Sequence, residues 1–276
     1  MAIEQLLRKF HLPPHTRVEL LRRGTNTVYA LPEVGRVLRV SDGGDLDAIQ
    51  QNVYAVAALA QHARVLPPAT LCAETAGNAV ATLWPLGGPS ESGAAELGAA
   101  LRSLHHVPTT HLCPLPRLDG LRRAWARFPA LRSAGVPPRY LDFLRGRLNA
   151  LTTAHDAMVC SGHAIIHGDA HPGNVVHFNG QTVLVDMDTL CTGPWQYDLV
   201  PAVVRAKRMA STTALRQLEA AYGTSVTGWV HLPPVAAATR SGFHSPALAI
   251  TMATVASETK TRQELTTDAH RCWASP

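Results

Sequence analysis

The chain has 276 residues, of which 46% are hydrophobic and 16% charged, and its mean hydropathy is close to zero. This length can bury a sizeable core in one or two domains, and no apolar stretch approaches the roughly 18 residues that cross a bilayer, so we expect no membrane partner. The net charge of +5 comes mainly from arginines scattered along the chain, in runs of at most two and without interleaved aromatic residues. This pattern argues against a nucleic-acid partner.

The cysteines and the first residues indicate the compartment. The five cysteines are odd in number, scattered and never in C-x-x-C spacing, which favours neither a disulfide framework nor a zinc site. Residues 3–10 form an amphipathic helical pattern with an early glutamate, rather than a secretory signal. We therefore expect a cytoplasmic protein.

The first third of the chain predicts a small sheet with a helix. Apolar runs bounded by turn residues predict antiparallel strands at 18–21, 23–29 and 37–40, and two more at about 69–73 and 79–84. Between them, residues 45–61 carry apolar side chains at the 3.6-residue period of a helix.

The rest of the chain predicts mainly helices. The helical pattern starts near residue 90 and returns at 138–160, at about 196–209 and 211–222, and in a final pair at 235–256 and 258–270. The basic stretch 121–131 is interpreted as a solvated helix face. His105 and His106 have no acid or cysteine at ligand spacing, so we interpret them as packing at a helix end rather than as a metal pair.

The most informative stretch runs from Ile166 to Asn174 and continues to Asp186. Short apolar runs precede Asp169 and Asp186, which predicts two buried strands that hold both acids at one rim. Transfer of a phosphate to a hydroxyl requires a carboxylate for the alcohol proton and oxygen ligands for Mg²⁺. The five-residue spacing of Asp169 and Asn174 equals that of the kinase pattern H-R-D-x-x-x-x-N.

His167-Gly-Asp-x-x-x-x-Asn174, the strand ending at Asp186, and Gly193 to Leu199 together resemble the aminoglycoside phosphotransferase and choline kinase family. The resemblance implies an α+β, bilobal protein-kinase-like fold. Residues 1–87 would form a small N-lobe with an antiparallel sheet and one helix, and residues 88–276 a larger, mainly helical C-lobe with the catalytic loop and the substrate-binding helices. It also implies ATP, with GTP as the alternative, and Mg²⁺ as cofactors.

The resemblance assigns three catalytic positions. Asp169 would orient and deprotonate the acceptor hydroxyl, while Asn174 and Asp186 would bind Mg²⁺. None of these groups needs a strongly shifted pKa, because positioning and electrostatics dominate phosphoryl transfer.

Four further residues near the motif would support the site. His167 would be structural, and Asp198 resembles the family's hydrogen-bond anchor for the catalytic loop. Asp188 is interpreted either as part of the metal shell or as a cap of the following turn. His171 would touch the phosphates or the substrate.

In the N-lobe, the turn that contains Thr25, Asn26 and Thr27 lies where the family's nucleotide-covering loop would be. Either its backbone N–H groups and hydroxyls would reach the phosphates, or it is a plain hairpin turn with a single glycine. Trp84 and Leu86, on either side of Pro85, would supply hinge donors to the purine.

The position of the family's phosphate-binding lysine is taken by Arg39, whose guanidinium can also bind phosphate. The glutamate that normally pairs with this position is missing, and Asn52 stands in its place. We therefore expect the ion pair of Arg39 to be missing or to be made by another acid.

The charge balance bears on the acceptor. A pI near 9.2 with only 20 acids argues against a polycationic aminoglycoside and favours a neutral or anionic hydroxylated small molecule, such as a macrolide or a nucleoside. An antibiotic phosphotransferase in resistance or self-resistance is the preferred function. A metabolic kinase for a choline-, fructosamine- or homoserine-like substrate is the alternative, and a nucleotide-binding module without catalysis is the third.

Overall fold

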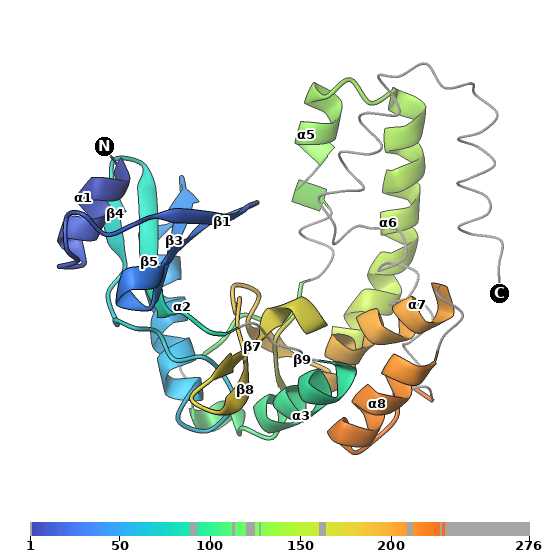
Figure 1. Cartoon of the computed structure of the whole chain (residues 1–276). Helices are drawn as coiled ribbons and strands as arrows, with labels where there is room; N and C mark the ends of the chain where they lie inside the picture. The colour runs from blue at the N-terminus through green and yellow to red at the C-terminus, as the bar shows by residue number, and fades with distance from the viewer. Residues whose placement is uncertain are drawn as a thin grey trace.

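The computed structural model describes residues 2–88, 93–111, 114–119, 125–126, 128–159, 164–208, 212–226 and 228–229. The helices predicted at 235–256 and 258–270 lie outside these residues, as do parts of the basic stretch 121–131. Figure 1 shows a blue N-terminal lobe beside a second lobe, whose short strands lie between α2 and α6 and above α3. No helix in the described residues has both the length and the apolar character needed to span a membrane.

The N-terminal lobe is built on a five-stranded antiparallel sheet in the order β1-β2-β3-β5-β4. Its strands are β1 (Glu19–Arg23), β2 (Thr27–Leu31), β3 (Arg36–Asp42), β4 (Glu74–Ala76) and β5 (Ala79–Pro85), with the 3₁₀ segment η1 (Pro32–Val34) between β2 and β3.

The strand predicted at 69–73 is wrong, because the ladder of β4 begins only at Glu74. The side chain of Gln50 holds the preceding backbone instead: it donates to the Leu71 carbonyl at 2.5 Å and accepts from the Ala73 N–H at 2.8 Å. Leu71 and Ala73 therefore pair with a helix side chain, and among the described residues of this segment only the Ala69 N–H donates to a strand, at the Leu83 carbonyl of β5.

Two helices flank this sheet, one more than the single helix expected for the lobe. Helix α1 (Ala2–Lys9) packs its leucines into the core of the lobe, which also contains Leu31, Leu38 and Leu83. Helix α2 (Leu46–Leu59) is preceded by Asp45 as its N-cap, and the Asp45 carboxylate accepts from the N–H groups of residues 47 and 48. Its inner face belongs to the core of the second lobe, so α2 joins the two lobes.

The second lobe contains five described α-helices and two small sheets. The helices are α3 (Ala94–His105), α5 (Phe128–Ser133), α6 (Pro138–Val159), α7 (Val200–Arg208) and α8 (Thr213–Tyr222), with the 3₁₀ segments η2 (Thr109–His111), η3 (Pro172–Asn174) and η4 (Trp195–Leu199). Strand β6 (Ala164–Ile166) pairs with β9 (Cys191–Gly193), and β7 (Val175–Phe178) pairs with β8 (Gln181–Leu184). The helix predicted at 196–209 divides into η4 and α7.

Backbone hydrogen bonds fasten the lobes together beside the predicted catalytic stretch. The Leu66 N–H donates to the Leu184 carbonyl at 2.9 Å, and the Leu184 N–H donates to the Arg64 carbonyl at 2.8 Å. The segment after α2 thus extends the β7–β8 sheet of the other lobe. After β5, Gly88 pairs with His177 of the same sheet, so the chain enters the second lobe at this point.

Helices α5 and α6 have a small core of their own, formed by Leu131, Val136, Leu141, Leu144 and Leu148. Figure 1 shows α6 rising away from α3, α7 and α8, on the side of the molecule opposite α1 and β4.

Candidate active site

The loop after β6 presents Asp169 to solvent. Gly168 has φ +80°, and a Cβ there would lie 2.5 Å from the Thr189 carbonyl oxygen, so only glycine fits. The Thr189 hydroxyl in turn donates to the His167 carbonyl at 2.5 Å. Asp169 itself is exposed, and its carboxylate forms no ion pair with any described residue.

A buried carboxylate anchors this loop from below. Asp198, in η4, accepts from the N–H groups of His167 at 2.7 Å and Gly168 at 2.8 Å, which matches the anchor role predicted for it. It also accepts from Nε2 of His105 at 3.0 Å, and Nδ1 of His105 accepts from the Tyr222 hydroxyl at 2.9 Å. Burial alone would raise the pKa of Asp198, but the hydrogen bond from His105, followed by the contact with His167, outweighs it and holds the pKa below its usual value.

His105 is a residue whose role was missed from the sequence. It is the last residue of α3 and packs its ring edge-on against Tyr222 at 5.5 Å, in line with the predicted packing at a helix end, but it also connects α3 and α8 to the loop after β6 through Asp198. Burial, and then the charge of Asp198, raise the pKa of the Tyr222 hydroxyl, which keeps it protonated as the donor of this chain of hydrogen bonds. Trp195 stacks on the Tyr222 ring at 5.0 Å.

The two predicted metal ligands are brought together by backbone contacts. The Asn174 side-chain amide donates to the Asp169 carbonyl at 3.0 Å, and the Asn174 carbonyl accepts from the Val185 N–H at 2.9 Å. His167 also contacts the Val185 carbonyl, at 2.9 Å, in keeping with its predicted structural role. Asp186, the next residue, therefore lies beside the Asp169–Asn174 loop.

Asp186 adopts an uncommon conformation and is surrounded by positive charge. Its φ is +62°, in the left-handed region that aspartate tolerates better than most residues. Its Oδ1 lies 3.1 Å from Nη2 of Arg39, and its Oδ2 lies 2.9 Å from Nη2 of Arg22. Burial would raise the pKa of Asp186, but Arg39, followed by Arg22, outweighs it, so the pKa is lowered and the carboxylate stays ionised.

Two acids that follow β8 take the place of the missing helix glutamate. Arg39 is mostly buried and forms ion pairs with both Asp186 and Asp188. Asn52 of α2, which holds the glutamate's place, donates to the Met187 carbonyl between these two acids at 3.0 Å. Helix α2 thus positions the partners of Arg39 instead of supplying one.

Asp188 has a further partner in the turn between β1 and β2. It accepts from the side-chain amide of Asn26 at 2.7 Å, and Asn26 accepts from the Ser41 hydroxyl. Asp188 is therefore more than a simple turn cap: its Oδ2 links the β1–β2 turn and β3 to the segment after β8. Thr25 and Thr27 flank Asn26 and lie outside the residues that line the cavity described next.

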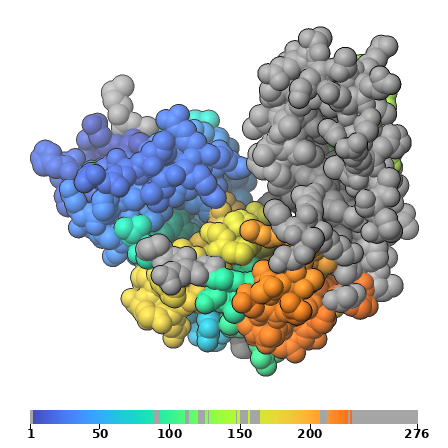
Figure 2. Space-filling view, turned by 45° about the vertical axis from the view of Figure 1, so that its right-hand side comes forward, coloured from blue at the N-terminus to red at the C-terminus, as the bar shows by residue number. Residues whose placement is uncertain are grey.

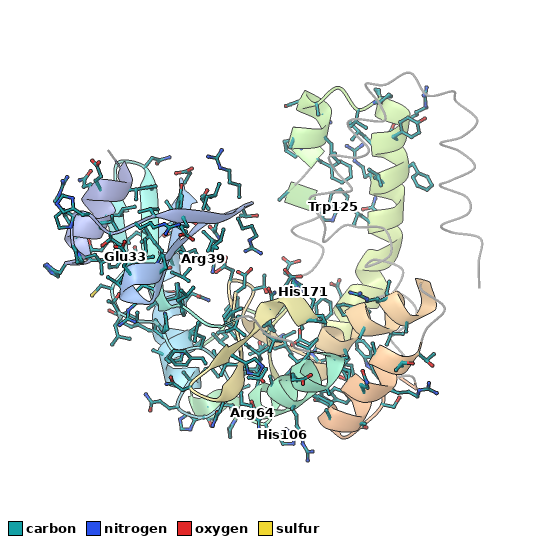
Figure 3. All side chains as sticks on the ribbon, viewed as in Figure 1. Glu33, Arg39, Arg64, His106, Trp125 and His171 are labelled. Atoms are coloured by element: carbon teal, nitrogen blue, oxygen red, sulfur yellow. The ribbon has the colours of Figure 1, made fainter. Side chains whose placement is uncertain are left out.

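A cavity of about 300 Å³ lies between the lobes at this point. The predicted site residues that line it are Arg39, Trp84, Leu86, Asn174 and Asp186, and its walls are otherwise mainly apolar: Leu21, Val28, Val37, Leu66, Val176, Val185 and Met187. One end is thus suited to a flat apolar ring, and the other carries charged and amide groups. In Figure 3, Arg39 and His171 lie on the two sides of the junction between the lobes, and Figure 2 shows the yellow catalytic segment at the surface between the blue lobe and the orange helices.

The Leu86 N–H of the hinge and the His171 ring, both predicted to contact the nucleotide or substrate, have hydrogen-bond partners within the protein. The Leu86 N–H already donates to the Gly35 carbonyl at 3.0 Å, so this purine donor is occupied in the structure. Between Pro85 and Gly88, the described residues leave the Gly87 N–H without a partner. His171 caps η3 by accepting from the Gly173 N–H at 3.0 Å, and partial burial lowers its pKa against the attraction of Asp169.

The donor set fits a magnesium nucleotide. Asn174 uses its amide nitrogen on Asp169, which leaves its oxygen for a ligand, and Asp186 supplies one ionised carboxylate. Mg²⁺ takes few protein carboxylates and completes its shell with water and phosphate oxygens. The described residues contain no cluster of three or more histidine, cysteine or acidic side chains that could hold a metal ion.

The chain is similar in sequence to the phosphotransferase enzyme family, whose model matches residues 25–235. No curated protein matches it.

Solved structures share the fold at low identity. An aminoglycoside phosphotransferase from Streptomyces rimosus is 18% identical, with a TM-score of 0.62 over 85% of this chain and 97% of that one, and it has also been solved with ADP and streptomycin. A choline/ethanolamine kinase family protein from Mesorhizobium loti is 19% identical, with a TM-score of 0.63 over 99% and 94%. An amicoumacin kinase in complex with AMP-PNP, Ca²⁺ and its substrate is 14% identical, with a TM-score of 0.66 over 98% and 91%. The predicted bilobal α+β fold is confirmed.

Proposed function

The chain belongs to the phosphotransferase enzyme family, and we propose that it transfers the terminal phosphate of ATP, or of GTP, to a hydroxyl group of a small molecule. The observation that carries this proposal is the placement of Asn174 and Asp186 at the charged end of one interlobe cavity, with the Asp169 backbone held against Asn174 by a hydrogen bond. A module that only bound nucleotides would not need an exposed, unpaired carboxylate at the tip of an anchored loop.

Each residue has a distinct task in this reaction. Asp169 accepts the proton of the acceptor hydroxyl and orients its oxygen toward the phosphate, and its exposure leaves room for the substrate. Arg39 binds phosphate oxygens from the N-lobe side. Asn174 and Asp186 would hold Mg²⁺, which when bound neutralises the charge of the phosphates. The apolar walls of the cavity enclose the purine and exclude water.

The acceptor is best explained as a hydroxylated small molecule that is not polycationic. The net charge of +5 weakens the attraction for a polycation, and structural relatives act on or bind compounds as different as streptomycin and amicoumacin. An antibiotic such as a macrolide or a nucleoside is therefore our first candidate. A choline-like metabolic alcohol is the second, since a choline/ethanolamine kinase family protein shares the fold over nearly the whole chain.

The test combines an acceptor screen with two matched variants. The parent is incubated with Mg²⁺ and ATP or GTP against macrolides, nucleoside antibiotics, aminoglycosides and choline-like alcohols, and mass spectrometry identifies products that gain one phosphoryl group. Asp169→Asn should lower the transfer rate by about 100- to 10,000-fold with little change in nucleotide affinity. Asp142→Asn, an equivalent change at an exposed α6 site, should leave both unchanged.

Turnover by Asp169→Asn at the parent's rate would remove Asp169 from its assigned role. Nucleotide binding by the parent without transfer to any acceptor, after the panel has been widened, would favour the non-catalytic module.

A further inference from the structure

The edge strand β1 contains a bulge that aims a second arginine into the cavity. Leu20 lies opposite Tyr29 and Arg22 opposite Val28, so Leu21 is an extra residue in β1. Side chains of adjacent residues normally point to opposite faces of a strand, but Leu21 and Arg22 both line the cavity. Bulges re-aim side chains in this way and are frequent next to active sites.

Arg22 reaches the same carboxylate as Arg39. Its Nη2 lies 2.9 Å from Oδ2 of Asp186, while Arg39 contacts Oδ1. Asp186 therefore carries a guanidinium on each oxygen. A metal ion bound to this carboxylate would share its lone pairs with the two arginines and would bring a further positive charge next to them, which weakens both contacts.

The surroundings of the two arginines decide which one leaves. Arg39 is 13% exposed at its side chain and has Asp188 as a second acidic partner, so it stays neutralised without Asp186. Arg22 is 54% exposed, and among the described residues Asp186 is its single acidic partner. A long exposed side chain with one partner moves at little cost, and guanidinium binds phosphate as well as carboxylate.

We propose that Arg22 is a phosphate-binding residue of the nucleotide site, held on Asp186 in the free protein and transferred to the nucleotide phosphates when the magnesium nucleotide binds. This rests on the proposed phosphotransferase function, since it assumes that the cavity takes a nucleotide. In this exchange, the guanidinium of Arg22 would move from Asp186 to phosphates bound at the same end of the cavity. Asp186 would thereby be freed from Arg22, and become available to the metal ion, at the moment when the phosphates bind.

Calorimetric binding of two probes tests the proposal without any acceptor substrate. Arg22→Gln should weaken binding of ATP with Mg²⁺ by about three- to tenfold, less than the loss of a fully buried charged hydrogen bond because Arg22 is partly exposed. Adenosine has no phosphate, so its dissociation constant for Arg22→Gln should lie within twofold of its dissociation constant for the parent. Arg22→Lys should recover part of the ATP affinity, since lysine keeps the charge but not the bidentate fork.

Arg17→Gln is the matched control. Arg17 is exposed, pairs with Glu19 at 2.7 Å and lies outside the cavity, so this variant removes the same charge from the same lobe. An ATP affinity that falls equally in both variants would show a long-range charge effect and overturn the proposal.

Two other results would also overturn it. Equal losses for ATP and adenosine in Arg22→Gln would mean that Arg22 only shapes the cavity, and unchanged affinity for both would mean that it stays on Asp186. Failure of the parent itself to bind ATP or GTP would refute the nucleotide site, and with it both this inference and the proposed function.

Discussion

The anchoring of the catalytic loop by Asp198 gives the sharpest quantitative prediction. Its Oδ1 accepts from the Gly168 N–H, and its Oδ2 accepts from the His167 N–H and from His105. In Asp198→Asn, the amide oxygen can replace one carboxylate oxygen, and the NH₂ group must then face at least one buried donor. One charge-assisted bond is lost, at about 1.5 to 3 kcal/mol, and the others lose about half their strength. We expect the variant to be less stable by about 3 to 5 kcal/mol.

Equilibrium urea unfolding, followed by tryptophan fluorescence, measures this difference. With a slope of about 3 kcal/mol per molar urea, the midpoint should fall by roughly 1 to 1.7 M. The control is again Asp142→Asn, because the Asp142 carboxylate is 68% exposed and its pair with Arg145 is on the surface; its effect should stay within about 0.5 kcal/mol. Equal stability of the two variants would refute the assignment of Asp198 as a buried anchor.

The difference in unfolding free energy between the parent and Asp198→Asn should depend on pH, and that dependence tests the direction of the Asp198 pKa shift. The folded-state pKa of Asp198 is lowered, so its carboxylate contributes stability that is fully present above the unfolded-state pKa of about 3.9. This contribution is lost as the pH falls through the lower folded-state value. The stability gap between parent and Asp198→Asn should therefore be constant from neutrality down to about pH 5 and shrink below about pH 4. A gap that widened in acid would contradict the direction of the shift.

Two further substitutions test the packing around the site. In Gly98→Ala, the new Cβ would lie 2.4 Å from the Leu218 carbonyl oxygen and push α3 away from α8, so the unfolding free energy should fall by about 1 to 3 kcal/mol. The control is Gly146→Ala on α6, where the Cβ would meet open space and the change should be neutral or stabilising. Asn52→Glu removes the hydrogen bond to the Met187 carbonyl and adds an acid beside two others, so differential scanning calorimetry should show a melting temperature lower by about 2 to 6 °C. A melting temperature of Asn52→Glu equal to or above that of the parent would contradict this reasoning.

The parts of the site that could be predicted are those encoded within a short stretch of sequence. Asp169, Asn174 and Asp186 lie within about twenty residues, the two acids each after an apolar run, and their chemistry is specific enough to indicate a phosphotransferase. The helices with a clear 3.6-residue period were also found with nearly correct bounds, because that period reflects one buried face.

The parts that could not be predicted depend on contacts between distant segments. His105 and Asp198 are 93 residues apart, and Arg22 and Asp186 are 164 residues apart. A histidine at a helix end and an arginine in a strand look the same in sequence whether they face solvent or a carboxylate. The bulge in β1 has no sequence signature either, and without it Arg22 would point away from the cavity.

The missing helix glutamate illustrates how such contacts change an interpretation. From the sequence, its absence weakened the case for catalysis, because Arg39 lacked a partner. In the structure, Asp186 and Asp188 neutralise Arg39, and Asn52 holds the backbone between them. The arginine that would bind phosphate and the acid that would bind metal therefore belong to one charge network. A change at Asn52 would consequently alter the binding of phosphate and of metal together, whereas a helix glutamate would act on the arginine alone.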